Sequence, residues 1–182
     1  MFLIFLIVLI FLFSMNQIIN TNTITHDINN FKAVFSQDRK IIGLDVGKKT
    51  IGIAISDPIS KIALTHKTIF RKKLKEDLQM LQKIINDNTV VSIVIGLPLN
   101  KDGTKGPIAQ SVITFSHILL KEFKLPILLW DERFSTIGIK REMKEAKIKR
   151  KRIEKSIDAA SATWILQSAL DSINNNWMKV NE

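Results

Sequence analysis

The fold of this chain is decided by residues 41–57, IIGLDVGKKTIGIAISD. Two short apolar runs rich in β-branched residues flank a GKKT turn at 47–50, a pattern that predicts a β-hairpin. Asp45 lies inside the first run, where a carboxylate is costly to bury unless it is paired or binds a metal. Gly43 and Gly52 leave space beside the backbone for such a ligand. An Asp held by turn amides fits the same pattern, so the hairpin alone leaves both interpretations open.

The composition is basic and lacks cysteine. Lys and Arg number 27 against 17 Asp and Glu, which gives a formal net charge of +10 over 182 residues. This balance favours a polyanionic partner, either a nucleic acid or an anionic membrane surface. The lack of Cys excludes disulfides, thiolate metal sites and a thiol nucleophile, and it fits a cytoplasmic location. His26, His66 and His117 are scattered without metal-ligand spacing.

The first 38 residues precede the expected domain. Residues 1–13 are all apolar, but a membrane-spanning helix needs about 18–20 such residues. Three interpretations are open: a short membrane anchor, a degenerate export signal, or upstream sequence translated before initiation at Met15. We favour the last because no Lys or Arg precedes the run and no small-residue cleavage site follows it. Residues 16–40 show little periodicity, which predicts a weakly ordered linker.

Strands and helices alternate beyond the hairpin. The patterns predict strands over 61–70, 90–97 and 126–130 and helices over 72–88, 108–123, 135–146 and 157–173. This order predicts an α/β fold with a mixed five-stranded sheet, in which the first three strands are antiparallel and helices cover both faces. The expected organisation is an N-terminal segment over 1–38, a globular domain over 39–173 and a polar tail over 174–182.

Acidic residues lie at the ends of three predicted elements. Asp45 is near the end of the first strand, Asp131 and Glu132 follow the last strand, and Asp158 opens the last helix. Like charges that converge need a cation between them, and oxygen ligands without Cys or His indicate Mg²⁺ or Mn²⁺. Two such ions about 4 Å apart would activate a water and stabilise the leaving oxygen of a phosphodiester. Each acid also has a structural interpretation: Asp131 or Glu132 could pair with Arg133, and Asp158 could stabilise a helix N-terminus.

Four motifs follow one another along the chain. They are Gly43-Leu44-Asp45-Val46-Gly47 with Ile51-Gly52-Ile53-Ala54, Gly96-Leu97-Pro98 with Asp102-Gly103, Asp131-Glu132-Arg133-Phe134-Ser135-Thr136, and Asp158-Ala159-Ala160-Ser161-Ala162. This series resembles the YqgF/RuvX family, whose members are described as nucleases of pre-16S ribosomal RNA and were once described as Holliday junction resolvase-like proteins. The resemblance covers about residues 40–170.

The resemblance implies a ribonuclease H-like fold and a cytoplasmic, metal-dependent nuclease. It places the catalytic and metal-binding acids at Asp45, Glu132 and Asp158, with Asp131 orienting Glu132 or the metal ligands. RuvC-type resolvases carry a further acid where this chain has Ser161, which disfavours junction resolution. The first 40 residues have no counterpart in a typical member, which supports upstream translation and weakens a membrane role.

A basic run covers residues 140–155, with nine basic residues against three acids just before Asp158. Such a run is usually a solvated connection, but beside an acidic site it could gather phosphates that the carboxylates alone would repel. The candidate substrate-binding residues are Lys48, Lys49, Arg133, Lys149, Arg150, Lys151 and Arg152.

Several functions compete for this pattern. The favoured one is metal-dependent hydrolysis of structured RNA at the 5′ end of pre-16S ribosomal RNA. The alternatives are a junction-resolving DNA nuclease, a non-catalytic RNA-binding assembly factor, and a sugar-kinase or actin-like ATPase whose phosphate hairpin would use Asp45, Gly47 and Thr50. The last class needs two lobes, and this chain has the length for one. The expected partner is RNA or a ribosomal particle, and the sequence leaves open a monomer or a weak dimer.

Overall fold

A computed structural model describes residues 23–34, 39–132 and 150–180 and, within the last helix, the side chains of residues 158–174. The described residues form a six-stranded mixed sheet in the order β1-β6-β5-β2-β3-β4. The strands are β1 (Ile24–Thr25), β2 (Lys40–Val46), β3 (Thr50–Ser56), β4 (Ala63–Phe70), β5 (Val90–Leu97) and β6 (Ile127–Asp131).

Strands β2, β3 and β4 form an antiparallel meander, whereas β1, β6, β5 and β2 pair in parallel. The predicted hairpin is confirmed, with Asp45 opposite Gly52 across the β2–β3 pair. This is the ribonuclease H-like α/β architecture expected from the sequence, with one strand more than expected.

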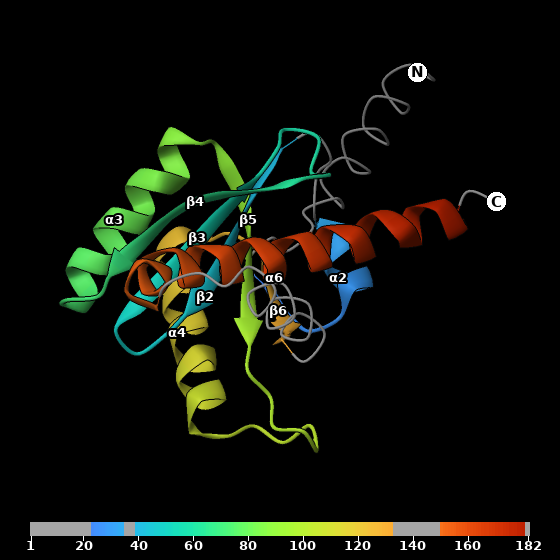
Figure 1. Cartoon of the computed structure of the whole chain (residues 1–182). Coiled ribbons are helices and arrows are strands. Elements are labelled where there is room, and N and C mark those ends of the chain that lie inside the picture. The colour runs from blue at the N-terminus through green and yellow to red at the C-terminus, as the bar shows by residue number, and fades with distance from the viewer. Residues whose placement is uncertain (1–22, 35–38, 133–149, 181–182) are drawn as a thin grey trace, which may run out of the picture.

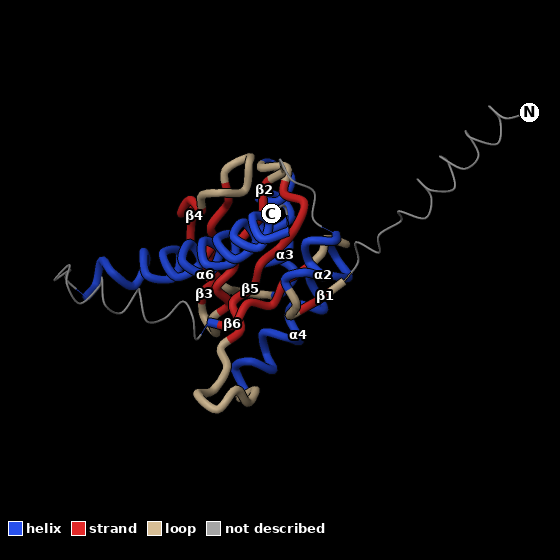
Figure 2. The backbone as a smooth tube through the Cα atoms, turned by 90° about the vertical axis from the view of Figure 1, so that its right-hand side faces the viewer, coloured by secondary structure: helices blue, strands red, loops and turns tan. Residues whose placement is uncertain are grey.

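Helices cover both faces of this sheet (Figures 1 and 2). Helices α3 (Leu74–Asp87) and α4 (Pro107–Phe123) pack their buried residues against one face, which we call the α3/α4 face. Helix α6 (Arg150–Val180) crosses the strands on the opposite face, which we call the α6 face, and Phe31 of α2 (Ile28–Val34) joins the same core. In the described part of the chain, no helix is both long enough and apolar enough to span a membrane.

Residues 24–34 correct the expectation of a weakly ordered linker. β1 extends the sheet by pairing Ile24 with Ile127, and the amide of Ile127 donates to the carbonyl of Thr23 at 2.9 Å. The side chain of Asp27 accepts a hydrogen bond from the amide of Asn29 at 2.8 Å, which stabilises the start of α2. Phe31 is fully buried, so tertiary contacts stabilise a segment that has no local periodicity.

The end of the chain also differs from the prediction. The last helix was expected over 157–173 with a polar tail behind it, but α6 runs from Arg150 to Val180. Part of the basic run therefore lies in a helix and not in a connecting loop. The short helix predicted over 135–146 lies outside the described residues.

Glycines on the α6 face let this helix approach the sheet closely. A Cβ atom added at Gly43 would lie 2.6 Å from the Cβ of Leu166, and one added at Gly52 would overlap the backbone carbonyl oxygen of Asp158. Ala159 and Ala162 are the buried small residues that α6 presents here. Because a strand residue larger than glycine would push the helix away, these glycines place Asp158 directly over β3.

Candidate active site

Asp45 faces α6 because of the alternation of side chains along β2. Leu44 and Val46 point into the core on the α3/α4 face, so Asp45 between them points to the opposite face. Its partner across the hairpin is Gly52, the glycine that contacts the backbone of Asp158. The pairing of β2 with β3 and the packing of α6 on Gly52 therefore bring Asp45 and Asp158 to the same place.

Glu132 reaches the same face from the other side of β2. It directly follows β6, and a Cβ atom added at Gly96 of the neighbouring β5 would overlap one of its carboxylate oxygens. Gly96 is one residue beyond Ile95, the partner of Leu44 in the β2–β5 pair. Glu132 therefore lies over β5, next to the strand that carries Asp45.

Asp45 interacts electrostatically with each of the other two acids. The pKa of Asp45 is raised from 3.8 to about 6, mainly by burial and then by the charge of Asp158, and a hydrogen bond with Ser161 partly offsets both effects. The pKa of Glu132 is likewise raised from 4.5 to about 7, mainly by burial, with smaller contributions from the charges of Asp45 and Asp131. Asp45 is thus coupled to both other acids, although they come from segments far apart in the chain.

The donor set fits a hard divalent cation. Asp45, Glu132 and Asp158 offer only carboxylate oxygens, the ligands that Mg²⁺ and Mn²⁺ prefer. A cation between them would relieve the repulsion that, after burial, contributes to the raised pKa values of Asp45 and Glu132. As they stand, no three Asp, Glu or His side chains of the described residues are arranged to hold an ion. The three acids therefore match a divalent cation in the chemistry of their oxygen ligands and in lying on the same face of the sheet.

Asp158 differs from the sequence-based expectation in one respect. It was expected to open the last helix, where the helix dipole alone could account for an acid. It lies instead about two turns inside α6, which begins at Arg150. Its position over β3 therefore has no explanation as a helix cap.

The predicted substrate-binding residues fall into two groups. Lys48 and Lys49 are exposed in the β2–β3 turn, and Lys48 lines a hollow of about 90 Å³ against the start of α4. Arg133 and Lys149 lie outside the described residues. Arg150, Lys151 and Arg152 belong to the first turn of α6, but their side chains lie outside the described part of the helix.

Arg71 is a structural residue of this site that the sequence pattern did not reveal. Its guanidinium donates to the carbonyl of Gly47 at 2.9 Å, and its backbone amide donates to the carbonyl of Lys49 at 2.8 Å. The same guanidinium pairs with Asp77 at 3.3 Å and lies 4.9 Å from the ring centroid of Phe115. Because the side chain of Asp77 is only 1% exposed, this buried pair fixes the turn that follows Asp45. The available signal was an Asp in the first turn of α3.

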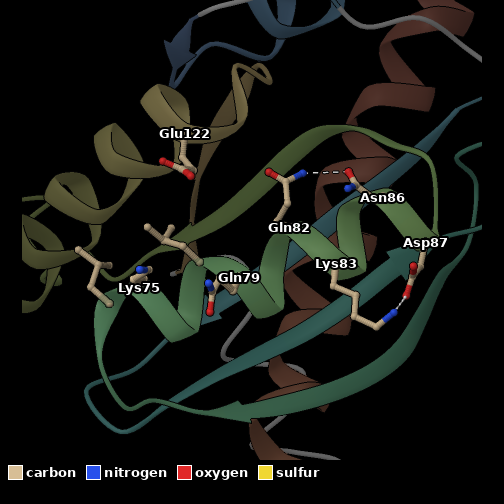
Figure 3. Close-up of a pocket in the computed structure, with 9 residues that line it drawn as sticks. Lys75, Gln79, Gln82, Lys83, Asn86, Asp87 and Glu122 are labelled. Atoms are coloured by element: carbon tan, nitrogen blue, oxygen red, sulfur yellow. Dashed lines mark hydrogen bonds and ion pairs between the residues drawn. The ribbon is translucent and has the colours of Figure 1, made fainter.

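A second, larger depression lies on the far side of the sheet (Figure 3). This open groove of about 650 Å³ is formed by α3 and by Glu122 of α4. Its rim carries the hydrogen bond between Gln82 and Asn86 and the ion pair between Lys83 and Asp87. None of the predicted site residues line it, so the groove is separate from the acidic cluster.

Comparisons with known proteins agree with the motifs. The family model described as "RuvX: Holliday junction resolvase" matches residues 39–172. A Clostridium novyi protein named "Putative pre-16S rRNA nuclease" is 45% identical over 134 residues, which cover 74% of this chain and 99% of that protein. A Rhodobacter capsulatus protein of the same name is 42% identical over 146 residues, which cover 80% of this chain and 92% of that protein. Among solved structures, RuvC of T. thermophilus with a Holliday junction substrate aligns with a TM-score of 0.44 at 11% identity, covering 74% of this chain and 94% of that one, a similarity from which no activity follows. The family match and the similarity to these relatives show that this chain belongs to the RuvX family.

Proposed function

We propose that this protein is a divalent-metal-dependent nuclease that hydrolyses phosphodiester bonds in structured RNA and processes the 5′ end of pre-16S ribosomal RNA in the cytoplasm. The single observation that carries the proposal is the electrostatic coupling of Asp45 with both Asp158 and Glu132, three half-buried acids from distant segments, with the pKa values of Asp45 and Glu132 raised by burial and by the neighbouring charges. Relatives named as pre-16S rRNA nucleases support the choice of substrate.

In this proposal Asp45, Glu132 and Asp158 hold Mg²⁺ or Mn²⁺. When bound, these ions would supply an activated water and stabilise the leaving oxygen of the phosphodiester. The protein fixes Asp45 on the rigid strand β2, and Gly52 and Gly96 leave the space in which Asp158 and Glu132 approach it. Because the chain has no Cys, a thiol nucleophile is excluded, and we propose direct attack by water.

Basic residues offset the repulsion between acids and substrate. Lys48 and Lys49 are exposed in the turn directly after β2, the strand that carries Asp45, and in this proposal they contact phosphates of the RNA strand that the acids cleave. The proposal extends this role to Arg133 and to the basic run at Lys149, Arg150, Lys151 and Arg152. These side chains offer charge but no base-reading pattern, so RNA shape is the expected source of specificity.

The direct test is cleavage by the purified full-length protein. A 5′-extended precursor of 16S rRNA is incubated with Mg²⁺, with Mn²⁺ or with EDTA. Cleavage is expected with either metal and not with EDTA, and Asp45→Asn is expected to abolish it. Asp87→Asn is the matched control, because Asp87 is an exposed acid on the opposite side of the sheet. Cleavage that survives Asp45→Asn would refute the assignment.

The description of the family model favours one competing substrate, a four-way DNA junction. The two substrates are separated by competition, in which unlabelled junction and unlabelled precursor RNA are compared as inhibitors of RNA cleavage. Stronger inhibition by the precursor is expected. A non-catalytic RNA-binding protein would bind the RNA equally well with and without Mg²⁺ and would show no cleavage.

A further inference from the structure

Phe70 is an exposed aromatic residue at the end of β4. Its side chain is 54% exposed, whereas the preceding Ile69 is 3% exposed and belongs to the core on the α3/α4 face. Because successive strand residues point to opposite faces, Phe70 projects on the α6 face. This is the face on which Asp45 and Glu132 lie.

The strand register locates Phe70 relative to the acids. Asp45 pairs with Gly52, and Gly52 pairs with Thr68, so these residues form one row across β2, β3 and β4. Phe70 lies two residues beyond Thr68, toward the β2–β3 turn, and pairs with Thr50. Standard strand spacing and rise therefore place its backbone about 12 Å from that of Asp45.

Phe70 is held next to two exposed lysines. Thr50, its partner in β3, directly follows the turn that carries Lys48 and Lys49, and the amide of Arg71 donates to the carbonyl of Lys49 at 2.8 Å. The end of β4 and the basic turn are thus joined by backbone hydrogen bonds. An aromatic ring beside positive charge is the arrangement by which proteins bind single-stranded nucleic acid, with bases stacked on rings and phosphates on basic side chains.

We propose that Phe70 is a stacking platform for an unpaired base of the RNA strand whose phosphates contact Lys48 and Lys49 as it enters the candidate active site. The inference rests on the proposed function and extends it, because it identifies the substrate near the scissile bond as single-stranded. A base in a duplex is already stacked and paired, so it could not use this ring.

The matched control is at the other end of the same strand. Leu64 is 56% exposed, close to the value for Phe70, but it offers no aromatic face and lies far from the basic turn. Truncation of Leu64 removes a similar amount of exposed apolar surface. If exposed apolar surface alone favoured RNA binding, Leu64→Ala and Phe70→Ala would therefore weaken RNA binding equally.

The experiment measures RNA binding by fluorescence anisotropy in the full-length Asp45→Asn protein, which separates binding from cleavage. This Asp45→Asn protein is the parent, and Phe70→Ala, Phe70→Tyr, Phe70→Leu or Leu64→Ala is added to it. The binding of each protein to single-stranded and to duplex oligonucleotides of one sequence is compared. Phe70→Ala and Phe70→Leu are expected to weaken single-strand binding at least about fivefold, as loss of one base stack should, and to leave duplex binding unchanged. Phe70→Tyr, which keeps the ring, and Leu64→Ala are expected to bind like the parent.

Equal single-strand binding by the parent and Phe70→Ala would overturn the inference while leaving the proposed nuclease intact. A loss of the same size on duplex RNA, or normal binding by Phe70→Leu, would also overturn it, because neither fits stacking. Failure of the parent to bind any RNA would instead refute the proposed function on which the inference rests.

Discussion

Replacing Asp45 by Asn should stabilise the metal-free protein, because the charged carboxylate is held at a cost. Its pKa is raised from 3.8 to about 6, first by burial and then by the charge of Asp158. One pKa unit corresponds to 1.36 kcal/mol, so the ionised form costs up to about 3 kcal/mol at pH 8. The isosteric amide carries no charge and keeps an oxygen that can accept the hydrogen bond from Ser161. For a chain of this size, the predicted gain corresponds to a rise in Tm of up to roughly 6–12 °C.

The effect has a defined pH window. A carboxyl whose pKa is higher in the folded state binds more protons when folded, so it lowers stability as the pH rises. The contribution of Asp45 is absent below about pH 4, develops between about pH 4 and 6, and is complete above pH 7. Glu132 behaves in the same way between about pH 4.5 and 7. The stability difference between Asp45→Asn and the parent should therefore grow over this interval and then remain constant.

The assay is thermal and urea unfolding in EDTA at pH 4, 6 and 8. Asp87→Asn serves as the control, because this acid is 57% exposed and should change the free energy of unfolding by less than about 0.5 kcal/mol. Mg²⁺ at millimolar concentration should stabilise the parent and not Asp45→Asn, since only the parent keeps the ligand set. Equal or lower stability of Asp45→Asn at pH 8 in EDTA would refute the reasoning that burial and the charge of Asp158 make the ionised Asp45 costly.

Three further predictions concern the scaffold of the site. Gly52→Ala should lower the free energy of unfolding by about 2 kcal/mol or more in urea titrations, because its Cβ would meet backbone atoms of α6. Gly106→Ala is the control and should be tolerated, because the nearest contact of its added Cβ is at 3.4 Å. Equal stability of the two variants would argue against the close approach of α6. Asp77→Ala should lower the free energy of unfolding by about 3 kcal/mol in the same titrations, because it leaves the Arg71 guanidinium without its carboxylate partner. Glu76→Gln breaks only an exposed ion pair and should lower it by less than about 0.5 kcal/mol. A small loss for Asp77→Ala would show that the buried pair does not fix the turn. When the logarithm of the RNA-binding constant is plotted against the logarithm of the salt concentration, Lys48→Gln should make the slope less steep by about 0.7–0.9, the value for one phosphate contact. Lys83→Gln on α3 should leave the slope unchanged. An unaltered slope for Lys48→Gln would exclude Lys48 from the RNA interface.

Elements with strong local periodicity were predicted well. Strand β5 runs from Val90 to Leu97, as expected from an apolar run ended by a proline, and the two strands of the hairpin differ from the prediction by one residue at most. Such runs are recognised because their own side chains determine the pattern of burial. The short strand β1 has only two residues, so it has no period to detect, and it forms because the edge of β6 offers hydrogen-bonding partners.

The sequence by itself determined the hairpin, the alternation that turns Asp45 away from the main core, and the identity of the acids at the ends of elements. Only the tertiary structure decided that these acids lie together, because their approach depends on packing between segments far apart in the chain. Gly52 and Gly96 show the reason: each glycine is unremarkable within its own strand, and its role is defined by α6 or Glu132 lying against it. The buried pair of Arg71 and Asp77 is a second case, since two charged residues near a helix start look like solvent-exposed groups until the fold encloses them. Local pattern thus specified the strands, and long-range packing specified the site.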